Sequence, residues 1–570
     1  MGPSVHRVVD HLVQVLAAAG VEYIFGVDGA NIEDVFDAAY DCDGLTAVLA
    51  KHEFSAATMA DGYARAGGGL GVVAATSGGG SLNLVAGLGE SLASRVPVLA
   101  LVGQPPAGMD GCGSFQDTSG RGGALDAHAL FSAVSLYCRR VMRPEQLGAA
   151  LDEALAAART GGPAVLLLPK DVQQAAIDRT DPIRAVQDSS TTDTTTVADA
   201  LRRVRGPVTI LAGEQVARDD ARGELERLRA ALRAWVAVVP DAKDVSGSPG
   251  LGNSSWLGVT GVMGHPRVAD AVSRSAACLL VGTRLAATAR AGLDPALADV
   301  QTLSIGAAQP YIACAHVNSP DLKVSLPALT RSLTGVGRPH GLQVLEPRPA
   351  TQLCPPVHEG PGLRYRDALT VLDAMLPDGT DVVVDAGNTG AAAIHQLPVR
   401  RDGRFVVALG MGGMGYSFGA GIGMCLARRN NSSGGRTVVI AGDGAFYMHG
   451  MELHTAVQYR LPLTVVLFNN NAHAMCVTRE QLFYGDRYSY NRFAPARLGA
   501  GLAAMFPGLP AVDVDDLAGL RRALDGALRR RGPSVVGIEC SADEIPPFAP
   551  FLDTIAAHQK ESNDHVPTRA

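Results

Sequence analysis

Short apolar runs alternate with amphipathic helical patterns along most of the chain. The clearest runs are GLGVVAATSGG, PVLALVG, PVTILAG, ACLLVG, DVVVDAG, RFVVALG, TVVIAGDG and LTVVLFNN. They are continuously apolar and rich in β-branched residues, which is typical of strands that are buried on both faces of a parallel sheet. Helix-length segments separate them. The pattern therefore predicts an α/β protein whose parallel sheets are covered by helices on both sides.

Two polar stretches interrupt the alternation and divide the chain. Residues 176–198 are rich in Thr, Asp and Ser, and residues 336–362 contain six prolines with little apolar periodicity. Segments of this composition are typical of linkers. We therefore predict three doubly wound parallel-sheet domains and a C-terminal tail. These are residues 1–175, 195–335, 363–550 and 551–570.

The composition narrows the function classes. The chain has 570 residues, 47% of them hydrophobic and 18% charged, so extensive disorder is excluded. A net charge of −7 provides no basic field for nucleic acid or an anionic membrane, and the longest apolar runs are too short to span one. Nine cysteines without a C-x-x-C pair fit reduced thiols. We expect a cytoplasmic enzyme that binds neither nucleic acid nor membrane.

Candidate metal ligands follow two of the predicted strands in the third domain. The run TVVIA leads into Gly442, Asp443 and Gly444, and the run LTVVLF leads into Asn470 after one helix and one strand. If the two strands are neighbours, the carboxylate and the amide oxygen emerge at the same sheet edge. With phosphate oxygens and waters they would form a Mg²⁺ shell for a diphosphate.

Other residues nearby suit the same anion. The two glycines allow close approach of the backbone, and a helix expected to begin near Ala445 directs its amide dipoles towards the phosphates. Gly387, Asn388 and Thr389 follow another strand and offer polar groups. Each motif alone is also compatible with an ordinary turn, and it is their spacing that favours a site.

A second nucleotide pattern competes with this interpretation. Residues 410–415 read GMGGMG directly after the strand RFVVALG, which matches the G-x-G-x-x-G fingerprint of dinucleotide-binding folds. This alternative predicts a nicotinamide-dependent oxidoreductase. It gives no role to the Asn triplet 469–471 or to the first domain, so we rank it below the diphosphate site.

The motifs together resemble a known family. The GDG and NN motifs, with KHEFSAATMADGYAR and TSGGGSLN in the first domain, are similar to thiamine-diphosphate enzymes of the acetolactate synthase type. The resemblance covers almost the whole chain. It implies a pyrimidine-binding, a central and a diphosphate-binding domain. It also implies a homodimer or homotetramer with the cofactor held between the first domain of one chain and the third of another.

The resemblance also implies roles for individual residues. Glu53 corresponds to the glutamate that bonds the aminopyrimidine and promotes deprotonation of the thiazolium ring. Met414 corresponds to the apolar side chain that bends the cofactor. The carbonyl of Ala472 is the expected third metal ligand, and Gln116 lies near the reacting carbons. The further cofactor-binding residues expected are Ser77, Asn83, Gly387, Asn388, Thr389, Gly412, Gly442, Gly444, Ala445, Asn470, His473 and Met475.

The chain departs from the synthase pattern around the expected acceptor pocket. Arg479 stands where synthases carry a tryptophan, and a guanidinium there suits an acceptor with a carboxylate, a phosphate or another polar group. Pairing with a local acid such as Glu480 is the alternative. His473 is expected to act as an acid or base, or else to cap the metal loop. Phe115, Gln116, Met475, Cys476 and Arg479 form the predicted substrate set.

The resemblance predicts a thiamine-diphosphate and Mg²⁺-dependent carboligase. It would decarboxylate a 2-oxo acid, with pyruvate as the expected donor, and transfer the acyl unit to a carbonyl acceptor in specialised biosynthesis. A simple 2-oxo acid decarboxylase is the first alternative, and a non-catalytic relative is disfavoured by intact Glu53, Asp443 and Asn470. The central domain echoes a flavin-binding fold, but the strand QTLSIG lacks the acid that usually follows it, so FAD binding stays open.

Overall fold

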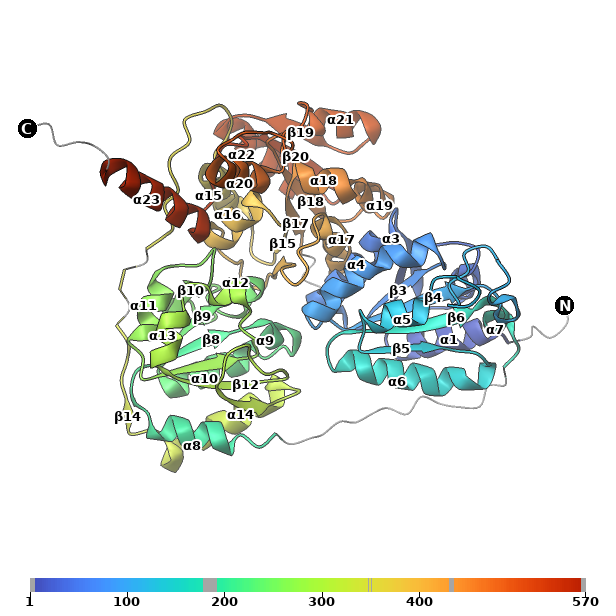
Figure 1. Ribbon diagram of the computed structural model, residues 1–570, viewed down its shortest axis with the longest axis horizontal. Coiled ribbons are helices and arrows are strands. Elements are labelled where there is room, and N and C mark those ends of the chain that lie inside the picture. The colour runs from blue at the N-terminus through green and yellow to red at the C-terminus, as the bar shows by residue number, and fades with distance from the viewer. Residues whose placement is uncertain (1–5, 178–191, 347, 350, 430–434, 565–570) are drawn as a thin grey trace, which may run out of the picture.

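The computed structural model describes residues 6–177, 192–346, 348–349, 351–429 and 435–564. Within these ranges the chain forms three α/β lobes, which follow one another along the sequence and are drawn in Figure 1 in blue, green and orange-red. Each lobe contains one six-stranded sheet, and every pair of neighbouring strands in the three sheets is parallel. The prediction of three doubly wound parallel sheets is therefore confirmed.

The first lobe has the strand order β2-β1-β3-β4-β6-β5. Strands β3, β4 and β6 are fully buried, which explains why they appear as unbroken apolar runs. The strands are β1 (Tyr23–Val27), β2 (Thr46–Leu49), β3 (Gly71–Ala75), β4 (Val98–Gln104), β5 (Tyr137–Arg140) and β6 (Pro163–Pro169). The helices are α1 (Val8–Ala18), α2 (Glu33–Tyr40), α3 (Glu53–Tyr63), α4 (Gly79–Ala93), α5 (Ala127–Ser132), α6 (Leu147–Arg159) and α7 (Lys170–Gln174).

The central lobe has a different strand order, β10-β9-β8-β11-β12-β13, which is the order of dinucleotide-binding folds. Its strands are β8 (Val208–Ala212), β9 (Trp235–Val238), β10 (Trp256–Val259), β11 (Ala277–Val281), β12 (Gln301–Gly306) and β13 (Ala315–Asn318). Its helices are α8 (Thr195–Arg203), α9 (Glu214–Arg218), α10 (Arg222–Leu232), α11 (Arg267–Ser273), α12 (Ala287–Arg290), α13 (Asp294–Asp299) and α14 (Leu322–Ser332). Two short strands, β7 (Arg205–Gly206) and β14 (Gly341–Leu342), pair beside it.

The third lobe repeats the order of the first, as β16-β15-β17-β18-β20-β19. Its strands are β15 (Asp381–Val384), β16 (Phe405–Val407), β17 (Thr437–Gly442), β18 (Leu463–Asn469), β19 (Ala511–Val514) and β20 (Ser534–Glu539). Its helices are α15 (Tyr365–Met375), α16 (Asn388–Gln396), α17 (Tyr416–Arg428), α18 (Asp443–His449), α19 (Leu453–Gln458), α20 (Ala474–Tyr484), α21 (Leu498–Met505), α22 (Leu517–Leu528) and α23 (Ala549–Asp564).

The two predicted linkers and the C-terminal tail are described to different extents by the structure. Most of the first predicted linker, 178–191, lies outside the described residues. The described part of the second, 336–346, 348–349 and 351–362, contains β14 and one short 3₁₀ turn and is otherwise without helix or strand. The tail expected from residue 551 begins inside α23, whereas residues 565–570 lie outside the described part of the chain.

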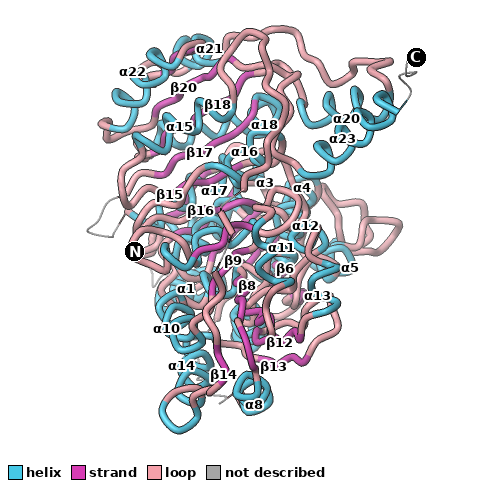
Figure 2. The backbone as a smooth tube through the Cα atoms, turned by 90° about the vertical axis from the view of Figure 1, so that its left-hand side faces the viewer, coloured by secondary structure: helices cyan, strands magenta, loops and turns pink. Residues whose placement is uncertain are grey.

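The first and third lobes pack through helices α3 and α17, which lie side by side in Figure 2. Small residues allow the close approach: a Cβ on Gly62 would lie 2.3 Å from the carbonyl oxygen of Ala420, and one on Gly423 would lie 2.0 Å from that of Met59. The two helix backbones are therefore in contact. None of the helices in the described residues combines the length and apolar character needed to cross a lipid bilayer.

Candidate functional site

The two strands that carry the predicted metal ligands are neighbours. Strands β17 and β18 pair in parallel, with Gly442 opposite Phe468, so both chains leave the sheet at the same edge. Asp443 is the first residue of α18 and Asn470 directly follows β18. Both residues therefore lie at the same edge of the sheet, as expected for neighbouring parallel strands.

Asp443 is a buried carboxylate held by backbone donors. Its side chain is 1% exposed and accepts hydrogen bonds from the amides of Gly444 (2.9 Å) and Ala472 (3.1 Å). Burial raises the pKa of this carboxyl to about 6, in spite of these hydrogen bonds. No lysine or arginine among the described residues forms an ion pair with it. A cation bound here would relieve the cost of burying the negative charge.

Asn470 is oriented by a tyrosine. Its side-chain amide nitrogen donates to the hydroxyl of Tyr365 at 3.3 Å, while its Oδ1 is buried and has no hydrogen-bond partner among the described residues. A buried unpaired carbonyl oxygen costs free energy unless a ligand meets it. Asp443 and Asn470 thus present one carboxylate and one amide oxygen, the ligand types that Mg²⁺ prefers.

Predicted cofactor residues surround this edge of the sheet. A Cβ on Gly444 would lie 2.4 Å from Nδ1 of His473 and 3.3 Å from the terminal methyl of Met414, so both side chains reach that glycine. The nitrogen Nδ1 of His473 is also buried and unpaired among the described residues. A Cβ on Gly442 would lie 3.9 Å from the hydroxyl of Thr389.

The start of α16 and the residues after Asp443 complete this group. Gly387 has a φ of 111°, which favours glycine, and it places Asn388 and Thr389 in the first turn of α16. The side-chain nitrogen of Asn388 donates to the carbonyl of Glu544 at 3.4 Å, and its buried Oδ1 has no partner among the described residues. Ala445 is buried in α18, which begins two residues earlier than the sequence predicted.

The loop that contains Met414 is held by a residue at the end of a strand in its own lobe. Asp385, directly after β15, accepts hydrogen bonds from the backbone amides of Gly415 and Ser417, both at 3.0 Å. Gly412 is exposed with a φ of 66°, and Met414 is half-buried. The loop thus leads from β16 into α17 with Met414 beside the metal edge.

Glu53 lies in the first lobe as the first residue of α3. Its carboxylate is 8% exposed and accepts a hydrogen bond of 2.9 Å from the side-chain amide of Asn83 on α4. A Cβ on Gly80 would lie 3.0 Å from its Oε1, so this glycine leaves room at the carboxylate. The buried hydroxyl of Ser77 accepts from Asn31 at 2.7 Å.

Gln116 and Phe115 lie on the loop that faces this pocket. The Gln116 side chain accepts a hydrogen bond of 3.2 Å from the hydroxyl of Thr76, and a Cβ on Gly78 would lie 2.9 Å from it. Gln116 has a φ of 59°, an uncommon conformation for a non-glycine residue. Phe115 is 76% exposed. The structure therefore brings Gln116 to the strand end next to Glu53.

Helix α20 carries the remaining predicted substrate residues. Met475 and Cys476 are half-buried, and Arg479 is exposed one turn after Met475. The expected alternative partner, Glu480, is buried and accepts a hydrogen bond from Asn491 instead. Within the described residues the side chain of Arg479 has no ion pair or hydrogen bond. Its guanidinium is therefore available to a ligand.

Within one chain, the Glu53 half and the Asp443 half of the predicted site are not bonded to each other. Glu53 contacts α4 of its own lobe, whereas Asp443 contacts the loops after β17 and β18. No hydrogen bond or ion pair among the described residues links the two carboxylates. Sequence reasoning also missed Tyr365, which orients Asn470, because nothing in its local sequence distinguishes it from a core tyrosine.

Family models match the three lobes in order. Residues 6–124 match the N-terminal TPP binding domain of thiamine pyrophosphate enzymes, residues 194–309 match their central domain, and residues 385–538 match their C-terminal TPP binding domain. The chain belongs to the thiamine pyrophosphate enzymes, and thiamine diphosphate, the same compound, is their cofactor.

The full-length relatives show which thiamine pyrophosphate enzymes the chain is similar to. The chain is 29% identical to acetolactate synthase isozyme 2 large subunit from Escherichia coli (strain K12), over 96% of this chain and 98% of the relative. It is also 29% identical to a probable acetolactate synthase large subunit from Methanocaldococcus jannaschii, over 95% and 93% of the two chains. The protein is thus an enzyme similar to acetolactate synthases, which confirms the resemblance seen in the sequence.

Proposed function

We propose that the enzyme is a carboligase, which decarboxylates a 2-oxo acid, pyruvate in the first instance, and transfers the acyl unit to a second carbonyl compound. The observation that carries this proposal is the Glu53 carboxylate, which is buried at the start of α3, accepts a hydrogen bond from Asn83 and lies close to Gly80. Full-length similarity to acetolactate synthases supports the transfer step over simple decarboxylation. The altered residues on α20 point to a role in specialised biosynthesis.

We further propose that Mg²⁺ holds the diphosphate at the edge of the third sheet. Asp443 and Asn470 fit this ion, because each offers a buried oxygen with no cation or donor side chain bound to it in the described residues. The carbonyl of Ala472 is the proposed third ligand. No group of three His, Cys, Asp or Glu side chains in the described part of the chain forms another metal centre.

The residues of the chain would then act as follows. When bound, thiamine diphosphate would supply a nucleophilic carbon and an electron sink for decarboxylation of the 2-oxo acid. Glu53 would hold a proton at the aminopyrimidine ring, and Met414 would support the bend between the two rings. His473, with a free Nδ1, would transfer a proton near the new alkoxide, and Gln116 would orient the donor.

Arg479 is the basis for the acceptor class. It is exposed on the helix that carries Met475 and Cys476, and no described residue neutralises it. A guanidinium binds a carboxylate or a phosphate in a bidentate manner. We therefore propose an acceptor aldehyde or ketone that carries an anionic group.

A second copy of the chain would complete the site. Exposed apolar side chains lie on the elements that carry site residues: Leu82 on α4, Met411 beside Met414, and Tyr447 and Met448 on α18. Their exposed fractions are 41%, 65%, 49% and 49%. Apolar residues gathered around a functional site are typical of an interface. We propose a homodimer or homotetramer in which Glu53 of one chain serves the Asp443 site of another.

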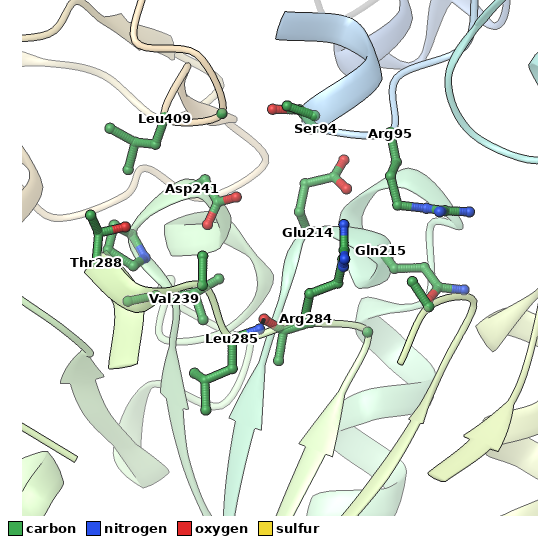
Figure 3. Close-up of a pocket in the computed structure, with 18 of the residues that line it drawn as sticks. Ser94, Arg95, Glu214, Gln215, Val239, Asp241, Arg284, Leu285, Thr288 and Leu409 are labelled. Carbon is green, nitrogen blue, oxygen red and sulfur yellow. Dashed lines mark hydrogen bonds between the residues drawn. The ribbon is translucent and has the colours of Figure 1, made fainter. Parts of the chain in front are cut away.

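We propose that this assembly works without FAD. The cavity at the carboxyl ends of the central strands has a volume of about 220 Å³, below the usual range for a cofactor site. Figure 3 shows the carboxyl groups of Glu214 and Asp241 in it, facing Arg284. The turn after β8 has one glycine, Gly213, followed by Glu214, and no acid follows β12. These residues do not fit a dinucleotide, and purified enzyme is expected to show no flavin absorbance.

Product analysis tests the proposed reaction. The enzyme, loaded with thiamine diphosphate and Mg²⁺, is incubated with pyruvate and with neutral or anionic aldehydes and ketones. We expect CO₂ release together with a ligated product, formed fastest with an anionic acceptor. Acetaldehyde without any ligated product would instead support the decarboxylase, and binding of NAD(P) with none of thiamine diphosphate would overturn both.

The variant Arg479→Gln tests the acceptor class. Loss of one charge-assisted contact should raise the acceptor KM roughly 10-fold for an anionic acceptor and leave CO₂ release without acceptor unchanged. Arg522→Gln, an exposed arginine on α22, is the matched control. An unchanged preference for anionic acceptors in Arg479→Gln would contradict the proposed role.

A further inference from the structure

Two buried glutamates form hydrogen bonds between the first and third lobes, one from each lobe to the other. Glu452, in the third lobe, is 1% exposed, and Glu90, in the first lobe, is 2% exposed. Each carboxylate accepts hydrogen bonds from two consecutive backbone amides of the other lobe. In each case the bonded backbone leads into a residue of the proposed catalytic machinery.

Glu452 holds the turn before Glu53. Its Oε1 accepts from the amides of Lys51 (2.7 Å) and His52 (3.0 Å), and its Oε2 accepts from the hydroxyl of Thr455 (3.0 Å). Both bonded amides immediately precede Glu53, the first residue of α3. The position of the α3 N-terminus, and with it the Glu53 backbone, therefore depends on a side chain from the third lobe.

Glu90 holds the loop before Met414. Its Oε2 accepts from the amide of Met411 at 2.6 Å, and its Oε1 accepts from the amide of Gly410 at 3.2 Å. The hydroxyl of Ser94 donates to the same carboxylate at 2.6 Å, and the buried Arg65 lies 3.7 Å from it. The loop that places Met414 beside Gly444 is thus attached to the first lobe.

The two contacts occupy equivalent places in two sheets of the same topology. Glu90 lies on α4, which follows β3, the third strand of the first lobe, and Glu452 lies on the helical segment that follows β17, the third strand of the third lobe. The amides they bind follow the second strands, β16 and β2. These amides lead into α17 and α3, the helix pair that packs the two lobes together. The arrangement is reciprocal.

We propose that Glu452 and Glu90 are a reciprocal pair of positioning residues, through which each lobe sets the place of the other lobe's cofactor-contacting residue. This proposal rests on the proposed function for the roles of Glu53 and Met414. A carboxylate suits the task, because it accepts two adjacent amides and stays bonded when buried. Loss of either carboxylate should displace one half of the cofactor site and leave the fold of both lobes intact.

Hydrogen exchange on the cofactor-free enzyme tests the contacts directly. In Glu452→Ala, the amides of Lys51 and His52 should exchange at least 10-fold faster than in the unchanged enzyme, because they lose a charged acceptor. In Glu90→Ala, the same is expected for Gly410 and Met411. The glutamine variants keep an acceptor oxygen and should restore most of the protection. Glu153→Ala, a surface carboxylate paired with Arg139, is the control.

Kinetics and binding then separate positioning from mere structural support. Misplacement of Glu53 in Glu452→Ala should lower kcat roughly 10- to 100-fold with little change in cofactor affinity. Glu90→Ala should instead weaken thiamine diphosphate binding about 10-fold, because the Met414 loop keeps its bonds to Asp385 and loses those to Glu90. Rescue by Gln is expected in both cases. Unchanged melting temperatures exclude unfolding as the cause.

Three results would overturn the proposal. Unchanged exchange at the four amides would show that the carboxylates do not hold them. Faster exchange with unchanged kcat and cofactor affinity would show that both residues only stabilise the structure and do not position the site. If the Gln variants fold but recover neither amide protection nor activity, the loss of a hydrogen-bond acceptor is not the cause of the effects. If the unchanged enzyme bound no thiamine diphosphate, the proposed function would fail, and the exchange results would still report on the contacts.

Discussion

The first and third lobes share one strand order and place different residue types at corresponding strand ends. After the second strand, the first lobe places Glu53 and the third lobe places the loop with Met414. After the third strand, the first lobe continues with Thr76 and Ser77, and the third lobe with Asp443. The topology thus places these residues at four corresponding strand ends. Under the proposed function, the residue types decide which of these ends carries a proton and which a metal.

The two carboxylates differ in what surrounds them. Glu53 accepts from a side-chain amide, Asn83, and its Oε1 lies close to Gly80. Asp443 accepts from two backbone amides, and burial raises its pKa to about 6. Backbone donors are fixed in place and suit a rigid ion site, whereas a carboxylate with a single side-chain partner suits exchange of a proton with a bound ring.

The largest effect is expected from Glu53→Gln. An amide cannot take or give the proton, so kcat should fall about 10²- to 10⁴-fold, the range expected for one acid–base group. Thiamine diphosphate binding, measured by calorimetry, should change far less. Undiminished turnover would show that the two carboxylates are not divided into a proton site and a metal site.

Asp443→Asn should affect the proposed metal site in the third lobe. Loss of the buried negative charge should weaken Mg²⁺-dependent cofactor binding roughly 10- to 100-fold, and high concentrations of both should restore part of the turnover. Titration of Mg²⁺ at fixed thiamine diphosphate measures this effect. The same Mg²⁺ dependence in Asp443→Asn and in the unchanged enzyme would place the metal elsewhere.

The repeated apolar runs made the fold accessible to sequence reasoning. Strands such as β3, β4 and β18 are buried on both faces, so their sequences carry no polar interruption. The pairing of β17 with β18 followed from the single helical crossover between them, and it puts Asp443 and Asn470 at the same edge of the sheet. Motifs at strand ends are local in sequence, and this is why most of the candidate site was predictable.

Contacts between residues far apart in the sequence were not predictable in this way. Tyr365 lies 105 positions from Asn470, and Glu452 lies 401 positions from Lys51. Contacts of this kind depend on how separate elements pack, and no periodicity reports them. The unpaired state of Arg479 was also undetermined, because the buried position of Glu480 appears only in the folded chain.

A smaller effect concerns the contact between the central and third lobes, where the strand orders differ. His265 and His395 stack at 4.5 Å, and burial lowers their pKa values to about 3 and about 4. The unfolded chain therefore takes up protons below about pH 6.5 that the folded chain does not. The free energy of unfolding should fall as the pH drops from 6.5 towards 4, by on the order of 3 kcal/mol for each histidine.

Denaturant titrations at several pH values measure this loss. His395→Phe should flatten the pH dependence, because it removes the titrating group and keeps an aromatic ring beside His265. His454→Asn, at an exposed histidine, should leave the dependence unchanged. An equal slope in His395→Phe and in the unchanged enzyme would assign the pH dependence to other groups.

The smallest effect is expected from Tyr365→Phe, which sharpens the account of the metal edge. The ring would keep its contact with Phe468, at 5.6 Å between centroids, and lose only the hydroxyl that accepts from Asn470. The amide of Asn470 would then be free to turn its nitrogen towards the metal, so the Mg²⁺ midpoint for cofactor binding should rise about 5-fold. Tyr459→Phe, half-buried beside β2, is the matched control. Equal Mg²⁺ midpoints in the two variants would show that Asn470 keeps its orientation without the tyrosine, and that the loop after β18 alone presents its oxygen.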